Sequence, residues 1–334
     1  MGVVYFSIIP TFEPSRYCKC WIVCFYYSYN YIRFVPDTIV MNGTSFVKGA
    51  DLAMRTPEEM MNAIINFAEK NENIRIVGME GSRVNKNIPK DSFQDFDITY
   101  FVTDIKKFKV NDDWLSFFGT IIMMQKPEDM ELFPAEEEGY SYLIIFDDYI
   151  KMDLTLLEES QFSDYLKEDK LRKILLDKSG NTHADVIPTD EEYWIKKPTA
   201  RSFDDCCNEF WNLTSYVVKG LCRREILFAI DLLQLMRNEL LRMLSWQVGT
   251  EHGFDFSVGK NYKFIAQYLP QEIWKNLLDT YRNNSYETMW ESFFLCLSIF
   301  RECAGTVAER LQYRYPDYDE NMTKYIEYFY YKYF

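Results

Sequence analysis

The stretch VGMEGSRVNKNIPKDSFQDFDITYFVTD, residues Val77 to Asp104, is the part of the chain around which the remainder is interpreted. It places Gly81 and Ser82 after a short apolar run, then a polar loop, and then Asp95 and Asp97 at the start of an alternating segment. Because residues two apart on a β-strand point to the same face, the two carboxylates are expected side by side. Paired carboxylates beside a glycine turn are typical of sites that bind phosphate groups through divalent ions.

The residues before this stretch predict a helix followed by a short strand. Thr56 to Glu59, TPEE, has the pattern of a capping box with proline at the first helical position. Apolar residues at helical spacing continue to about Lys70. Ile74 to Val77 is then expected to form a strand, and the chain to turn out of it from Gly78.

The residues after the stretch predict further strands of the same sheet. Tyr140 to Phe146 and Tyr149 to Leu157 alternate between apolar and polar residues and are separated by a tight turn. Asp153 lies on the polar face of the second strand. Phe162 to Leu176 has helical spacing. These patterns predict a domain built on a mixed α/β sheet.

The second half of the chain carries apolar residues at helical spacing. The predicted helices are Phe203–Leu221, Arg224–Trp246, Pro270–Tyr281 and Tyr286–Tyr313. We therefore expect a mixed-sheet N-terminal domain over residues 54–190 and an all-helical C-terminal domain over residues 191–334. Residues 1–53 are interpreted as an upstream extension, either non-native or disordered, because no clear periodicity runs through them.

Composition and charge argue against several classes of function. The 334 residues carry a net charge of −14, whereas a nucleic-acid groove needs clustered lysine and arginine. The eight cysteines show no disulfide or zinc spacing, and two histidines argue against histidine-centred catalysis. The apolar run Trp21–Tyr27 is far shorter than the roughly 20 residues of a membrane helix. We expect a cytoplasmic monomer that binds neither nucleic acid nor membranes.

Asp95, Asp97 and Asp153 form a carboxylate set suited to nucleotidyl transfer. In this reaction an acceptor hydroxyl displaces pyrophosphate from the α-phosphorus of a nucleoside triphosphate. Carboxylates hold two magnesium ions about 3.5–4 Å apart, which stabilise the charge. Asp95 and Asp97 are the expected ligands, and Asp153 is a third ligand, the general base, or both. Each motif alone is more often a solvated surface feature, so the combination in this order carries the hypothesis.

The triphosphate needs hydrogen-bond donors as well as metal ions. Gly81 permits close approach of the backbone to phosphate, and the Ser82 hydroxyl with its neighbouring amides can donate to the β- or γ-phosphate. Arg83 adds a charged donor. Lys219 and Lys260 are further candidates, although lysines at such positions are more often simply solvated. No GxxxxGK[ST] motif occurs, which excludes a Walker-type ATPase.

The predicted helix Phe203–Leu221 carries a polar line opposite its apolar stripe. Asp204, Asp205 and Glu209 belong to this polar side. They are candidates for a cleft wall that attracts a cationic acceptor. The alternative is an ordinary solvated helix face.

Many blocks of the chain together resemble the aminoglycoside 6-adenylyltransferase family, the streptomycin-modifying type. These blocks are MRTPEEMM, IRIVGMEGSRVNKNIPKDSFQDFDITYFVTD, MMQKPEDMELF, KMDLTLL, YWIKKPTARSFDDCCNEFWN, YVVKGLCRREILFAID, FSVGKNYKF and YPDYDE. The resemblance spans roughly Met54 to the C-terminus and does not cover residues 1–53.

The resemblance implies a nucleotidyltransferase-fold domain followed by a helical, aminoglycoside-binding domain, with ATP and the antibiotic between them. It implies AMP transfer from Mg-ATP to the 6-hydroxyl of streptomycin, release of pyrophosphate, and antibiotic resistance. Carried over by motif, Asp95 and Asp97 would hold magnesium, Ser82 the triphosphate, and Asp153 would be the later carboxylate. Streptomycin carries guanidinium groups that pair with carboxylates, so an acidic cleft is the expected receptor.

Two alternatives to this function remain open on the sequence. One is a nucleotidyltransferase that acts on another aminoglycoside or on a protein hydroxyl, which would use the same metal chemistry. The other is a non-catalytic nucleotide-binding module, against which the intact Asp95, Asp97 and Asp153 argue.

Overall fold

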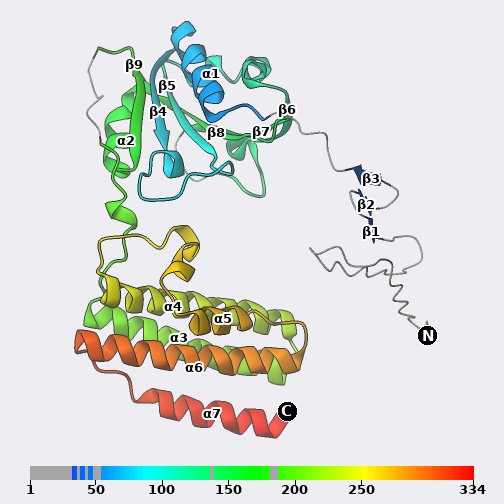
Figure 1. The fold of residues 1–334 in the computed structure, drawn as a ribbon, viewed down its shortest axis with the longest axis vertical. Coiled ribbons are helices and arrows are strands. Elements are labelled where there is room, and N and C mark those ends of the chain that lie inside the picture. The colour runs from blue at the N-terminus through cyan, green and yellow to red at the C-terminus, as the bar shows by residue number, and fades with distance from the viewer. Residues whose placement is uncertain (1–31, 36–37, 42–43, 48–53, 136–138, 181–186) are drawn as a thin grey trace, which may run out of the picture.

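The computed structural model describes residues 32–35, 38–41, 44–47, 54–135, 139–180 and 187–334. A sheet with its covering helices forms one part, and a set of long helices forms the other (Figure 1). The sheet ends at Asp177 and the first long helix begins at Ala200. A mixed-sheet region followed by a helical region is the predicted fold class, and it is confirmed. The boundary placed at residue 190 stays a prediction.

The six-stranded sheet is mixed. Its strands are β4 (Ile74–Glu80), β5 (Phe96–Val102), β6 (Ile121–Gln125), β7 (Tyr140–Phe146), β8 (Lys151–Glu158) and β9 (Arg172–Asp177). They lie in the order β6-β7-β8-β5-β4-β9, with β5 and β8 parallel and every other neighbouring pair antiparallel. The parallel pair stands near the middle of the sheet and carries Asp97 and Asp153, and Asp95 lies just before β5.

The two faces of the sheet are covered unequally. Helix α1 (Pro57–Lys70) packs its apolar side, including Met60 and Ile64, against one face. The short helix α2 (Phe162–Glu168) covers part of the other face through a small cluster with Ile76 and Phe101. Polar residues on the second face therefore have room beside α2. Asp97 and Asp153 belong to this face, because the residues before and after each of them on the strand point into the core beneath α1.

The sequence pattern predicted α1 correctly, whereas the predicted helix Phe162–Leu176 is only partly right. Thr56 and Glu59 form the expected capping box. The predicted helix Phe162–Leu176 is wrong beyond Glu168, because Arg172–Asp177 forms the edge strand β9 against β4. Strand β4 is also longer than predicted, since it runs on to Glu80 before the chain turns. The strand β6 was not predicted.

The helical part consists of five α-helices among the described residues. They are α3 (Ala200–Cys222), α4 (Ile226–His252), α5 (Gln271–Asp279), α6 (Tyr286–Leu311) and α7 (Tyr318–Tyr333). The first four confirm the predicted helices with shifted ends, and α7 was not predicted. The rings of Phe210 and Phe300 stack 3.6 Å apart between α3 and α6, and both side chains are fully buried. Both residues belong to the apolar core that the long helices share.

The first 53 residues are described only in part. Three short strands, β1 (Ile32–Val35), β2 (Thr38–Met41) and β3 (Thr44–Val47), pair antiparallel in that order. The prediction of an upstream extension, non-native or disordered, otherwise lies outside the described residues. None of the described helices combines the length and apolar character needed to cross a bilayer.

The stacked pair in the helical core predicts a stability change. Phe300→Ala should lower the free energy of unfolding by about 3–5 kcal/mol, because truncation removes buried apolar area and leaves a cavity beside Phe210. Denaturant unfolding followed by far-ultraviolet circular dichroism measures this change. Leu227→Ala, on the same helical part at a side chain 76% exposed, is the matched control and should change stability by less than about 0.5 kcal/mol. Equal losses in the two variants would contradict the packing described here.

Candidate active site

Asp97 and Asp153 are direct neighbours in the parallel pair β5 and β8. Burial and then the nearby carboxylates of Asp153, Asp95 and Glu80 raise the pKa of Asp97 to about 6. Four acidic groups therefore act on one small region of the sheet. The prediction that Asp95, Asp97 and Asp153 come together is consistent with this arrangement, while their roles stay predictions.

A lysine pairs with two members of this cluster. The Lys151 ammonium lies 3.0 Å from Asp95 Oδ2 and 2.6 Å from Asp153 Oδ2. Although burial disfavours the ammonium, its hydrogen bonds with Asp153 and Asp95 hold the pKa of Lys151 above its usual value. No motif in the sequence marks Lys151 as a functional residue. The available signal was its position two residues before Asp153, on the same face of the strand.

Gly81 is required by the Asp97 side chain. Its φ of +69° lies in the left-handed region, and a Cβ built on it would stand 2.3 Å from Asp97 Oδ2. A side chain here would therefore strain the backbone and displace the carboxylate. Gly81 opens the short 3-10 turn Gly81–Arg83, which brings Ser82 to the end of β4. The backbone at Gly81 was expected to approach a phosphate group closely. In the structure it closely approaches the Asp97 carboxylate.

Arg83 and Lys90 hold the loop that follows this turn. Arg83 Nε donates to the Asp95 carbonyl at 2.9 Å, and its guanidinium lies 3.6 Å from the centre of the Phe96 ring. Lys90 Nζ donates to the carbonyls of Ser82, Arg83 and Asn85. Arg83 is therefore engaged with the start of β5, and its predicted role as a phosphate donor stays a prediction.

The donor set fits a divalent cation. Asp153 Oδ1 is buried without a hydrogen-bond partner among the described residues, and Lys151 already places one positive charge between two carboxylates. As the side chains stand, no three His, Cys, Asp or Glu residues of the described part converge closely enough to hold a metal ion. The Lys151 ammonium lies between the Asp95 and Asp153 carboxylates. An oxygen-only set of carboxylates suits magnesium in particular.

The acceptor wall predicted on α3 stays a prediction. Asp204, Asp205 and Glu209 are exposed on α3, which packs mainly on α4 and α7. Asp205 pairs with Arg201 at 2.9 Å. The Lys219 ammonium lies 4.9 Å from the Tyr216 ring centre on the same helix. No described contact connects any of these side chains with Asp97 or Asp153.

Lys260 begins the short turn Lys260–Tyr262, which follows one wall of a cavity in the sequence. A cavity of about 340 Å³ separates the loop Asn87–Pro89 and Asp190 from the segment Asp255–Ser257. The Asp190 carboxylate anchors this side, because it accepts hydrogen bonds from Asn87 at 2.8 Å and from the Trp194 indole at 3.0 Å. The turn that carries Lys260 follows directly, and its side chain is exposed.

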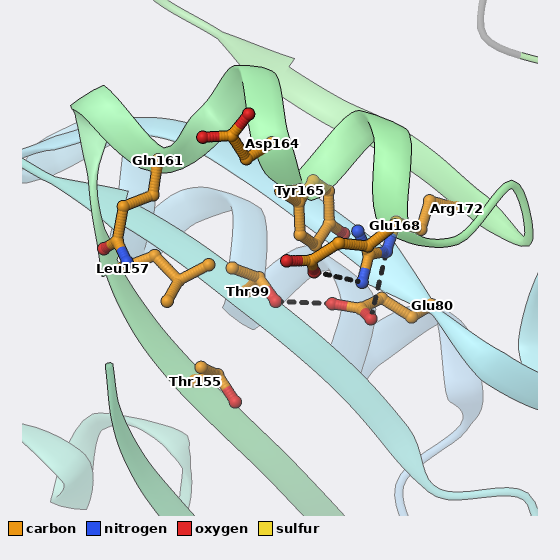
Figure 2. Close-up of a pocket in the computed structure, with 9 residues that line it drawn as sticks. All are labelled: Glu80, Thr99, Thr155, Leu157, Gln161, Asp164, Tyr165, Glu168 and Arg172. Carbon is orange, nitrogen blue, oxygen red and sulfur yellow. Dashed lines mark hydrogen bonds and ion pairs between the residues drawn. The ribbon is translucent and has the colours of Figure 1, made fainter. Parts of the chain in front are cut away.

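A second cavity of about 400 Å³ opens on the carboxylate face of the sheet (Figure 2). Residues of β4, β5, β8, β9 and the region of α2 line it. They are Glu80, Thr99, Thr155, Leu157, Gln161, Asp164, Tyr165, Glu168 and Arg172. Sequence reasoning identified none of them, because they meet only through strand pairing and the packing of α2.

Comparison with known proteins gives the family of the chain. The family described as streptomycin adenylyltransferase matches residues 54–329. The chain belongs to this family. It is therefore an adenylyltransferase, and residues 1–53 precede the matched part.

Relatives of this family member are similar over most of their length. An aminoglycoside 6-adenylyltransferase of Campylobacter jejuni is 55% identical over 274 residues, 82% of this chain and 95% of that protein. A protein of the same description from Bacillus subtilis is 54% identical over 277 residues, 82% of this chain and 98% of that protein. The crystal structure of an aminoglycoside 6-adenyltransferase from Bacillus subtilis is 49% identical, covers 83% of this chain and 99% of its own, and superposes with a TM-score of 0.42.

The contact between Gly81 and Asp97 predicts a strong effect on activity. Gly81→Ala should reduce the turnover number for adenylyl transfer roughly 100-fold, because the added Cβ moves the Asp97 carboxylate out of place. Gly180→Ala is the matched control, since Gly180 has a φ of +79° but no atom within 4 Å of a built Cβ. Steady-state kinetics of both variants separates backbone strain from the displacement of Asp97. Similar losses in both would contradict the assignment.

The position of Lys151 predicts a loss of stability in chelating buffer. Lys151→Met should lower the free energy of unfolding by about 1 kcal/mol, because two half-buried carboxylates lose their counter-ion. Thermal unfolding with a chelator measures the change. Lys324→Met removes an exposed ion pair with Glu320 and should have a smaller effect. A Lys151→Met variant as stable as the wild type would show that the ammonium does not offset the carboxylate repulsion.

Proposed function

We propose that this chain transfers AMP from ATP to the 6-hydroxyl of streptomycin, releases pyrophosphate and thereby inactivates the antibiotic. The observation that carries this proposal is the Asp97–Asp153 pair beside Gly81 and Ser82, in a chain whose relatives are described as aminoglycoside 6-adenylyltransferases. The cationic antibiotic also suits a chain with a net charge of −14.

Asp95, Asp97 and Asp153 would hold two magnesium ions. When bound, the ions supply charge stabilisation to the triphosphate and to the attacking and leaving oxygens. Lys151 supplies the compensating positive charge to Asp95 and Asp153 when they have no other partner. The same two carboxylates therefore have a defined pairing before the substrates enter.

The chain's own groups would then handle the donor phosphates and the acceptor proton. The Ser82 hydroxyl and the amides of the Gly81–Arg83 turn would donate to the triphosphate. The acceptor oxygen forms a bond to the α-phosphorus, and the bond from that phosphorus to pyrophosphate breaks. Asp153 Oδ1 has no hydrogen-bond partner in the described structure and would take the proton of the acceptor hydroxyl.

Several expectations remain proposals beside this one. Lys219 and Lys260 would bind phosphate, although no described contact links either lysine with Asp97. Asp204, Asp205 and Glu209 would bind the acceptor, and no described contact links them with Asp97 either. A monomer that works in the cytoplasm is likewise still a prediction.

Loss of one carboxylate charge tests the reaction directly. Asp97→Asn should lower the turnover number by about 10²–10⁴-fold with the fold retained, because its shape is kept while a proposed metal ligand is lost. The measurement is transfer of labelled AMP to a panel of aminoglycosides, with the product mass determined. Asp113→Asn changes an exposed acid at the start of the 3-10 helix Asp113–Phe118; it is the control and should keep full activity.

Each outcome of this panel has a separate meaning. Transfer to streptomycin that disappears in Asp97→Asn agrees with the proposal. Transfer by the wild type to other aminoglycosides but not to streptomycin would overturn the choice of acceptor. Binding of ATP without transfer to any acceptor would favour a non-catalytic nucleotide-binding module.

A further inference from the structure

Three backbone carbonyl oxygens that follow β4 converge on one ammonium group. Lys90 Nζ lies 3.0 Å from the Ser82 oxygen, 2.7 Å from the Arg83 oxygen and 2.9 Å from the Asn85 oxygen. An ammonium group has three N–H donors, so these contacts use all of them. None of the three partners is a carboxylate. The contacts therefore do not serve to neutralise charge, and their common effect is on the backbone of the turn.

The Ser82 carbonyl is held by a second side chain as well. Gln94 Nε2 donates to this oxygen at 3.0 Å. A carbonyl oxygen has two lone pairs, and Lys90 and Gln94 together engage both. Rotation of the peptide group between Ser82 and Arg83 would therefore break two hydrogen bonds at once. The orientation of this peptide group is fixed by side chains that lie outside the turn.

The orientation of the carbonyls also determines where the amides of the turn point. A peptide group is planar and trans, so its N–H points opposite to its C=O. The Arg83 N–H shares a peptide group with the Ser82 carbonyl and therefore points away from Lys90. The next amide, that of Val84, donates to the Gly81 carbonyl at 3.3 Å and closes the turn. Lys90 thus aligns an amide donor without contacting it.

A buried carboxylate anchors the loop that carries Lys90. Asp190, which is only 3% exposed, accepts hydrogen bonds from Asn85 Nδ2 at 3.2 Å and from Asn87 Nδ2 at 2.8 Å. The Asn87 amide in turn donates to Asn85 Oδ1 at 2.8 Å. Asn85 is therefore held by its side chain while its carbonyl binds Lys90. The loop between the turn and Lys90 is fixed at its middle.

We propose that Lys90 is a positioning residue for the triphosphate, because it holds the Gly81–Arg83 turn with its peptide N–H groups directed to the phosphate oxygens. The inference rests on the proposed function, which assigns these N–H groups to the triphosphate. Lys90 acts through the carbonyls of Ser82 and Arg83 and does not itself contact phosphate. Donors that are already aligned need no reordering when the nucleotide binds, and this raises affinity.

Removal of the ammonium tests the inference. Lys90→Met keeps an unbranched side chain and removes all three donors. It should raise the dissociation constant for ATP with magnesium about tenfold in titration calorimetry without an acceptor. The dissociation constant for pyrophosphate with magnesium should rise in parallel, whereas that for AMP, which lacks the β- and γ-phosphates, should change less than twofold.

A second measurement examines the turn before any nucleotide is present. Hydrogen–deuterium exchange of the segment from Gly81 to Lys90 should be faster in nucleotide-free Lys90→Met than in the wild type, because the carbonyls of the turn are no longer held. Far-ultraviolet circular dichroism should show that the variant keeps its fold, since Lys90 is an exposed residue.

Two further variants separate position from charge. Lys86→Met is the matched control, because Lys86 is an exposed lysine of the same loop and its loss changes the net charge equally. It should leave the affinity for ATP within twofold of the wild type. Gln94→Met removes the other donor to the Ser82 carbonyl without a change of charge, and should weaken ATP binding in the same direction as Lys90→Met.

The outcomes distinguish this inference from the proposed function. Equal weakening of ATP binding in Lys86→Met and Lys90→Met would assign the effect to charge and overturn the inference. Weaker binding in Lys90→Met with unchanged exchange of the nucleotide-free turn would assign Lys90 to direct phosphate contact, which also overturns it. Unchanged ATP affinity in Lys90→Met, with streptomycin adenylylated by the wild type, would overturn the inference alone. A wild type that binds ATP but adenylylates no aminoglycoside would overturn the function, while the calorimetry would still decide the inference.

Discussion

Repulsion between carboxylates on the parallel strands β5 and β8 is the constraint on which the site depends. The register places Asp97 beside Asp153, and neither can move away without breaking the central pair of the sheet. Burial and neighbouring negative charge raise the pKa of Asp97 to about 6, which records the cost of this arrangement. Lys151 offsets part of it. The ion pairs of its ammonium with Asp95 and Asp153 place positive charge where the carboxylates repel each other.

The surrounding structure keeps this unfavourable cluster in place. Gly81 lets the backbone pass against the Asp97 carboxylate, where any Cβ would collide with it. Arg83 binds the Asp95 carbonyl and covers the Phe96 ring, so the start of β5 is fixed from the turn that precedes it. On the opposite face, the apolar core beneath α1 supplies the stability that the polar face lacks. One face of the sheet thus supplies the packing that stabilises the fold, and the other face carries the carboxylates.

The sequence predicted those parts that local patterns determine. The capping box of Thr56, the alternation around Asp97 and the spacing of the long helices are each contained within a few turns or residues. Strand β9 and the role of Lys151 depend on which strands become neighbours, and a single sequence does not specify that. The cavity residues were missed for the same reason. Charge on α3 was visible in the sequence, but charge alone does not say which elements a helix faces.

The face of the sheet that carries Asp97 and Asp153 continues with polar residues. Thr99 and Thr155 follow the two carboxylates by two residues and are paired with each other across β5 and β8. Both line a cavity of about 400 Å³, where Arg172 also pairs with Glu80 and Glu168. Because side chains two apart on a strand share a face, the alternation that sends Ile98 and Leu154 into the core beneath α1 also places these threonines on the side of α2. One register therefore fixes both the apolar core and the row of polar groups that begins with the carboxylate pair.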